Sequence, residues 1–177
     1  MLKIIFLGLF AAVAIFAGVA ATRPTHFSVS RSASLAVPPA TVFPQVNELR
    51  KWEAWSPWAK LDPNCKMTYE GPAAGVGAAY AWDGNNQVGA GRMEILESKP
   101  NEALRMKLDF LKPFKASNNV QFTFQPQGEG TLVTWTMDGK HNFMGQCISV
   151  FLDCDKMVGG DFEKGLASMK AVAEAKN

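Results

Sequence analysis

The sequence lacks an excess of either charge. Its 18 Lys and Arg residues against 16 Asp and Glu residues give a formal net charge of +2 over 177 residues, and the basic residues are scattered along the chain. Domains that bind nucleic acid carry a basic patch or stripe. We therefore expect no nucleic-acid partner.

Residues that build metal sites and disulfide frameworks are also scarce. There are two histidines, His26 and His141, far apart in the chain, and three cysteines, Cys65, Cys147 and Cys154. No Cys-x-x-Cys or clustered histidine spacing occurs, so we predict neither a metal nor a cofactor. The odd number of cysteines leaves at least one thiol free. On a shared helix Cys147 and Cys154 would lie about 10.5 Å apart along its axis, beyond disulfide reach, so only a pair with Cys65 is open.

Common catalytic motifs are missing as well. The chain has no Gly-x-Ser-x-Gly, no His-Glu-x-x-His and no glycine-rich phosphate loop before a helix. The side chains that remain for acid-base chemistry are His141, Asp138 and Asp83, near the ends of expected strands. A surface imidazole near a turn is the favoured interpretation of His141. Whether the protein is an enzyme therefore stays open.

Residues 1–24 form an N-terminal hydrophobic segment. An uncharged run extends from Ile4 to Ala21 and is closed by Thr22-Arg23-Pro24. As a helix the run would span about 27 Å, close to the hydrocarbon thickness of a bilayer. We interpret it as a transmembrane anchor or as a signal peptide cut after Ala20 or Ala21, and its length beyond the usual core of about 7–15 residues favours the anchor. Both interpretations place the remaining domain outside the cytoplasm, in the cell envelope or periplasm, or secreted after cleavage.

Residues 25–177 are enough for one domain with its own core. Period-two alternation predicts a first strand at Phe27–Leu35, where Arg31 is the single charged residue on the apolar side. Pro38-Pro39 ends it, and a short helix follows over 40–49. The same alternation recurs between residues 66 and 139 and predicts a meander of antiparallel strands. Three tryptophans within Trp52–Trp58 are expected to plug one end of the core or, if exposed, to form a contact surface for a partner.

The C-terminal stretch is expected to be the helix around which the domain is built. Asp161, after the pair Gly159-Gly160, is a good N-cap, and Phe162, Leu166 and Met169 then recur on one face. Residues 143–158 are expected to form a separate helix or helical lid, divided from the C-terminal helix by the glycine pair. A curved sheet closed by one helix leaves a wedge between them. Its walls mix bulky residues with small ones (Ala79, Ala81, Gly89, Gly91), which leave room for a ligand or simply permit the sheet to bend.

Several short stretches resemble the START-like superfamily, and most closely its bacterial SRPBCC branch of polyketide cyclase/dehydrase-type proteins. They are Ser30-Arg31-Ser32 leading to Pro38–Phe43, Trp52–Trp58, Gly77–Trp82, Gly130–Trp135 and Asp161–Leu166. The resemblance covers residues 27 to about 175. It implies an α+β helix-grip (START/Bet v 1-like) fold, a curved antiparallel sheet wrapped around a long C-terminal helix, with a deep hydrophobic cavity. Because the superfamily includes carriers, receptors, cyclases and oxygenase domains, it does not imply an enzyme, and no catalytic residue is transferred.

The expected function is binding of a hydrophobic small molecule or lipid in that cavity by a membrane-tethered or exported domain. The alternative is a polyketide cyclase/dehydrase-like or hydrolase-type enzyme acting at the cavity mouth. The oligomeric state and the ligand are left open. The predicted ligand-binding residues are the bulky apolar and aromatic side chains of the wedge, namely Trp55, Trp58, Tyr69, Tyr80, Trp82, Met93, Phe122, Phe124, Trp135, Met137, Phe162, Leu166 and Met169.

Overall fold

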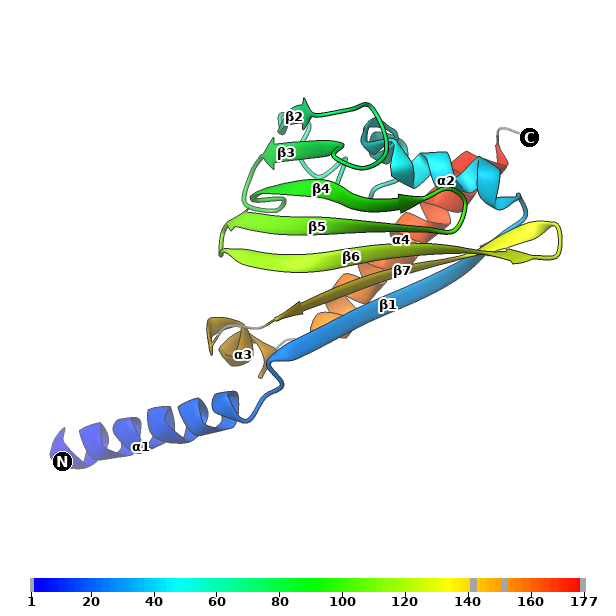
Figure 1. Cartoon of the computed structure of the whole chain (residues 1–177). Helices are drawn as coiled ribbons and strands as arrows, with labels where there is room; N and C mark the ends of the chain where they lie inside the picture. Colours follow the sequence, from blue (N-terminus) through cyan, green and yellow to red (C-terminus); the bar gives the residue numbers. More distant parts are fainter. Residues whose placement is uncertain (1, 141–142, 151–152, 176–177) are drawn as a thin grey trace.

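The computed structural model describes residues 2–140, 143–150 and 153–175 (Figure 1). Two helices and a short 3-10 helix precede most of the sheet, and two helices follow it. In chain order the elements are α1 (Leu2–Ala21), β1 (His26–Leu35), α2 (Pro39–Asn47), the 3-10 helix η1 (Leu49–Ala54), β2 (Lys66–Glu70), β3 (Ala79–Asp83), β4 (Ala90–Lys99), β5 (Ala103–Lys112), β6 (Ala116–Gln127), β7 (Gly130–Lys140), α3 (Phe143–Ser149) and α4 (Cys154–Glu174).

The seven strands form one antiparallel sheet in the order β1-β7-β6-β5-β4-β3-β2. Strands β2 to β7 follow one another as hairpins, which confirms the predicted meander. β1 pairs with β7 from His26 opposite Lys140 to Leu35 opposite Thr131. The long helix α4 lies across one face of the sheet (Figure 1). The α+β helix-grip fold expected from the sequence is thereby confirmed.

The sequence periodicity explains which side chains enter the core. On β6 and β7 the buried residues alternate with exposed or half-buried ones, as in Val120, Phe122 and Phe124. On α4 the residues Phe162 and Leu166 face the sheet and are 1% exposed. Full burial of such a side chain contributes about 1.5–3 kcal/mol, so this shared face holds helix and sheet together.

Two of the three clustered tryptophans plug the core. Trp52 and Trp55 are buried, and their indole N–H groups donate to the backbone carbonyls of Val46 (3.0 Å) and Gln45 (2.9 Å). Because both rings are buried, the interpretation of this segment as an exposed contact surface is wrong for them. Trp58 is only half-buried.

The prediction that the glycine pair separates two helices is wrong. Helix α4 begins at Cys154 and runs through Gly159 and Gly160 without a break. Its N-cap is Asp153, whose carboxylate accepts hydrogen bonds from the backbone N–H groups of Asp155 and Lys156. Asp161, expected to be the N-cap, lies inside the helix.

Arg31 on β1 explains the glycine at position 159. Its Nε donates to Glu163 Oε1 at 2.8 Å, and its two terminal nitrogens each donate to Asp155 at 2.9 Å. The guanidinium lies directly against Gly159, where a Cβ atom would overlap it. Gly159 therefore permits the close approach of Arg31 to the helix, and the charged residue on the inner side of β1 is an anchor for α4.

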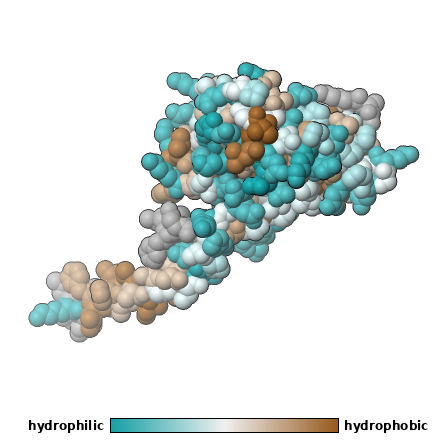
Figure 2. Space-filling view, in the orientation of Figure 1, coloured by the Kyte–Doolittle hydropathy of each residue, from teal (hydrophilic) through white to brown (hydrophobic). Residues whose placement is uncertain are grey.

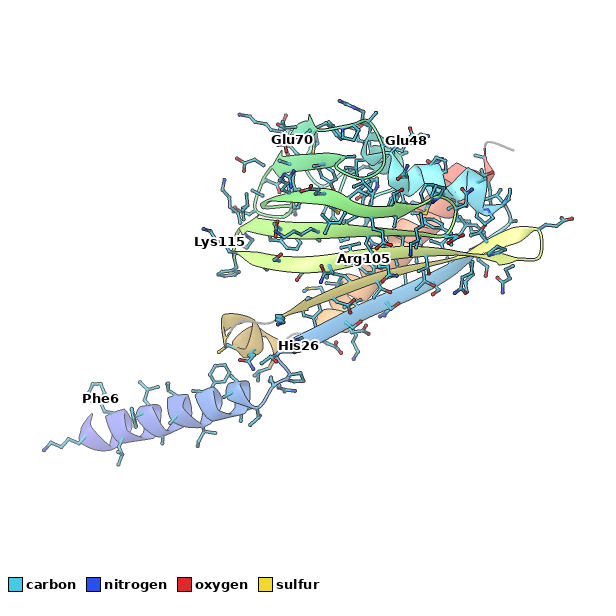
Figure 3. All side chains as sticks on the ribbon, in the orientation of Figure 1. Phe6, His26, Glu48, Glu70, Arg105 and Lys115 are labelled. Carbon is cyan, nitrogen blue, oxygen red and sulfur yellow. The ribbon has the colours of Figure 1, made fainter. Side chains whose placement is uncertain are left out.

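The N-terminal helix α1 extends away from the domain as an apolar surface (Figure 2). Its side chains Phe6, Leu7 and Phe10 are exposed, and Phe6 lies near the end of α1 that is far from the domain (Figure 3). At the other end of α1, Gln146 Nε2 donates to the carbonyl of Arg23 at 2.8 Å. In the part of the chain that the structure describes, no helix combines the length and the apolarity needed to cross a membrane. The division of the chain after residue 24 stays a prediction.

We predict opposite effects for alanine at the two neighbouring glycines. Gly160→Ala meets open space and should raise the free energy of unfolding by about 0.5–1 kcal/mol, the usual gain for alanine in a helix. Gly159→Ala should lower stability below wild type, because its Cβ displaces the Arg31 guanidinium from Asp155 and Glu163. Urea unfolding of the full-length variants measures both.

The double variant provides the control. In an Arg31→Met background the obstruction is gone, so Gly159→Ala should regain the stabilising effect seen at Gly160. Equal stabilisation by both single substitutions would contradict the role of Arg31.

Candidate ligand-binding pocket

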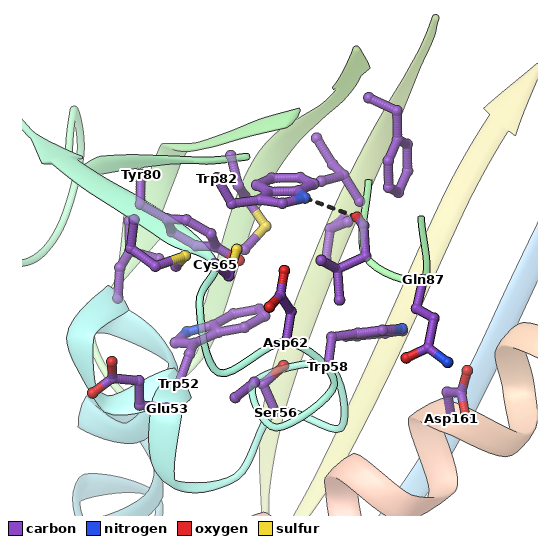
Figure 4. Close-up of a pocket in the computed structure, with 18 of the residues that line it drawn as sticks. Trp52, Glu53, Ser56, Trp58, Asp62, Cys65, Tyr80, Trp82, Gln87 and Asp161 are labelled. Atoms are coloured by element: carbon purple, nitrogen blue, oxygen red, sulfur yellow. Dashed lines mark hydrogen bonds between the residues drawn. The ribbon is translucent and has the colours of Figure 1, made fainter. Parts of the chain in front are cut away.

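A cavity of about 510 Å³ lies between the sheet and the first turns of α4 (Figure 4). Its walls come from the inner faces of β2 to β7, the segment after η1 and α4 from Met157 to Phe162. The volume is within the range of small-molecule sites, about 300–1,000 Å³. Eight of the predicted ligand-binding residues line it: Trp58, Tyr69, Tyr80, Trp82, Met93, Trp135, Met137 and Phe162.

The other five predicted residues do not line the cavity. Trp55, Phe122, Phe124, Leu166 and Met169 are at most 2% exposed and belong to a solid core. They lie behind an aromatic stack in which Trp135 is parallel to Phe162, with ring centroids 4.0 Å apart. Phe122 packs on Trp135 at 4.9 Å. Whether the eight lining residues bind a ligand stays a prediction.

The small residues of the wedge do not enlarge the cavity. Gly91 lies opposite Trp82 in the β3–β4 pairing, and the Trp82 indole occupies the space that a side chain at Gly91 would need. The indole N–H donates to the carbonyl of Val88 at 3.0 Å, which fixes the ring as a wall. Ala79, Ala81 and Gly89 are likewise absent from the lining. None of the four small residues of the wedge therefore lines the cavity.

Sequence reasoning missed a second group of lining residues. Apolar members are Leu49, Trp52, Met67, Val88, Leu108, Phe110, Val120 and Met157. Leu108, Phe110 and Val120 continue the inner phase of β5 and β6, so the strand alternation already contained a signal for them. Polar members are Glu53, Ser56, Asp62, Cys65, Gln87 and Asp161, which come from η1, from loops and from α4. No periodic pattern marks such positions.

Burial raises the pKa of three titratable groups that line the cavity, Tyr69, Tyr80 and Cys65. Burial, followed by the proximity of Tyr69 and Cys65, raises the pKa of Tyr80 far above its usual value. The pKa of Tyr69 is raised by burial and by Glu53, and Arg50 opposes this from 4.1 Å above the ring centroid. Burial also raises the pKa of the Cys65 thiol, which makes it a poor nucleophile.

Two of the three acid-base candidates from the sequence do not line the cavity. Asp83 pairs with Lys112 at 3.0 Å, Asp138 is exposed on the other face of β7, and neither lines the cavity. His141 lies outside the described residues. Among the described residues no group of three or more His, Cys, Asp or Glu side chains is arranged to hold a metal ion, and Cys65 and Cys147 are free thiols.

Comparison with known proteins assigns the chain to a protein family. The family model described as "Polyketide cyclase / dehydrase and lipid transport" matches residues 26–174. The chain belongs to this family. The START-like, SRPBCC-type resemblance of the sequence is thus confirmed. A search of curated proteins finds no match.

Solved structures with the same fold are distant in sequence from this family member. Protein CV1439 from Chromobacterium violaceum has a TM-score of 0.60 at 15% identity, covering 86% of this chain and 99% of its own. Ara h 8.0201 has a TM-score of 0.58 at 9% identity, covering 85% and 99%. Ms6760 from Mycobacterium smegmatis has a TM-score of 0.56 at 17% identity, covering 85% and 92%. At these identities the similarity shows the fold alone.

The two tyrosines that line the cavity are half-buried and give a test of its environment. The sequence has two tyrosines, so in a Tyr69→Phe variant the alkaline tyrosinate absorbance reports Tyr80 alone. The folded state keeps a proton on Tyr80 that the unfolded chain releases near pH 10, so stability should fall as the pH rises above about 10. Tyrosinate should therefore appear only together with unfolding, followed by circular dichroism. Reversible ionisation of Tyr80 near pH 10 in folded protein would contradict its burial.

Proposed function

We propose that the domain binds a hydrophobic small molecule or lipid in the cavity between the sheet and α4. The observation that carries the proposal is the cavity itself, whose walls are mostly aromatic and aliphatic and whose few polar groups lie toward the loops. Transfer of a ligand's apolar surface from water into such walls contributes about 25 cal/mol per Å². The family description, which includes lipid transport, supports the same role.

We also propose that residues 1–24 direct the domain out of the cytoplasm. The uncharged run from Ile4 to Ala21 and the exposed Phe6, Leu7 and Phe10 of α1 support this. An exposed apolar surface of this kind is covered when it associates with a membrane. It is absent from the mature protein when a signal peptidase removes the segment. The segment either remains with the membrane or is cleaved.

Fractionation of the producing cells with intact-mass measurement tests the proposed location. We expect either full-length chain in the envelope fraction or a shorter chain beginning after Ala20 or Ala21. Full-length protein found only in the cytoplasmic fraction would contradict the proposal.

A cyclase-type or hydrolase-type reaction is the alternative. The family description names cyclase and dehydrase, and the carboxylates of Glu53, Asp62 and Asp161 are the acid-base groups at the cavity. For a substrate that wild type converts, the amide variants should lose turnover and keep apolar dye binding. Undiminished turnover in all three would exclude these carboxylates as catalytic residues.

We predict that filling the cavity abolishes binding of Nile red, a neutral apolar dye. Leu108 lines the cavity. In Leu108→Trp the larger side chain fills part of the cavity and leaves less volume for a ligand. Full-length protein should bind the dye saturably, and the variant should bind it at least about ten-fold more weakly, a loss of about 1.4 kcal/mol. Fluorescence titration measures the affinity, and thermal unfolding confirms the fold.

Leu96→Trp is the matched control, since Leu96 is exposed on the outer face of β4. Both variants retain α1, so dye bound to that helix is the same in each. Equal dye affinity of the two variants, or no saturable binding by wild type, would contradict the proposed cavity function.

A further inference from the structure

The mouth of the cavity carries negative charge. Three carboxylates line it, those of Glu53, Asp62 and Asp161, and none of the lining residues is a lysine or arginine. Figure 4 shows the three carboxylates around the aromatic rings of the cavity. They come from η1, the loop after it and α4, so the carboxylates lie on the helix and loop side of the cavity, opposite the sheet.

Two of these carboxylates have no cationic partner among the described residues. Asp62 is held by backbone N–H groups, with Oδ1 accepting from Asn64 (2.9 Å) and Oδ2 from Asn85 (2.7 Å). These bonds orient the carboxylate and leave its charge uncompensated. Glu53 makes no hydrogen bond or ion pair within the described part of the chain. Asp161 is paired with Lys164 at 2.9 Å.

The aromatic walls beside the carboxylates are also suited to a positively charged ligand group. Tryptophan and tyrosine rings attract cations to their faces, and aromatic cages of this composition recognise quaternary ammonium groups. Tyr69 already shows this behaviour, because the guanidinium of Arg50 lies 4.1 Å above its ring centroid. Trp58 and Trp82 present further rings to the cavity.

A metal ion does not fit this mouth. The carboxylates do not gather into a group of three ligands anywhere in the described residues. An organic cation needs no such coordination, because its charge is spread over a larger volume and its substituents contact the rings.

We propose that the cavity takes an amphipathic ligand with an apolar body and an organic ammonium end, which lies at the mouth between Glu53 and Asp62. This inference rests on the proposed function and names the class of its ligand. An anionic end would meet the unpaired charges of Glu53 and Asp62, and an uncharged end would gain at most a hydrogen bond to them.

Competition between three probes of equal chain length tests the inference. Octyltrimethylammonium, octanol and octanoate are each titrated against Nile red bound to the full-length protein, in low salt. The cation should displace the dye at about ten-fold lower concentration than octanol, since each exposed pair contributes only modestly, and octanoate should be the weakest.

Single variants assign the preference to the mouth. Glu53→Gln should reduce the preference for the cation over octanol by about three-fold, and Asp62→Asn should do the same if thermal unfolding shows that its loop is intact. Glu129→Gln, in the distant β6–β7 turn, is the matched control and should leave the preference unchanged. An unchanged preference in both mouth variants would overturn the assignment.

The wild-type comparison needs no variant and separates the two proposals. Equal displacement by all three probes, or stronger displacement by octanoate, would overturn the ammonium inference and leave the hydrophobic cavity in place. Failure of every probe to displace the dye would contradict the proposed function itself.

Discussion

The contact between Trp135 and Phe162 divides the interior of the domain in two. The rings stack in parallel with their centroids 4.0 Å apart, and they join β7 to α4. On the C-terminal side of this stack, Leu166 and Met169 are buried in a solid core. On its N-terminal side, the helix and sheet separate around the cavity. Because Arg31 holds the start of α4 to β1 on that open side, the helix spans the cavity without closing it.

This division assigns different chemistry to the two halves. The solid half supplies stability through close packing. Replacing its large side chains with smaller ones would lower the free energy of unfolding. The hollow half has aromatic walls, two half-buried tyrosines and the carboxylates of Glu53, Asp62 and Asp161. Such a site favours burial of an apolar body with its polar end in reach of solvent. The family description names both cyclase/dehydrase and lipid transport, and neither Asp83 nor Asp138 lines the cavity.

The fold could be predicted from the sequence because its patterns are periodic. The alternation on β6 and β7 and the face of Phe162 and Leu166 on α4 gave the sheet, the helix and the wedge between them. The sequence showed Arg31 as a charged residue on the apolar side of its strand. Its partners could not be predicted, because Asp155 and Glu163 are far from it in the sequence and pair with it only in the folded domain. The site was predicted in part. Strand residues such as Tyr80 were found by their phase, whereas Glu53 and Asp62 depend on loop conformation, which leaves no period in the sequence.

Native mass spectrometry of the full-length protein, purified without added ligand from the cells that produce it, tests the central claim most directly. The account predicts a single bound organic molecule per chain, released on denaturation, apolar over most of its length and absent from the Leu108→Trp variant. A chain that carries no small molecule, or one that is retained equally by wild type and Leu108→Trp, would contradict a ligand site in the cavity between the sheet and α4.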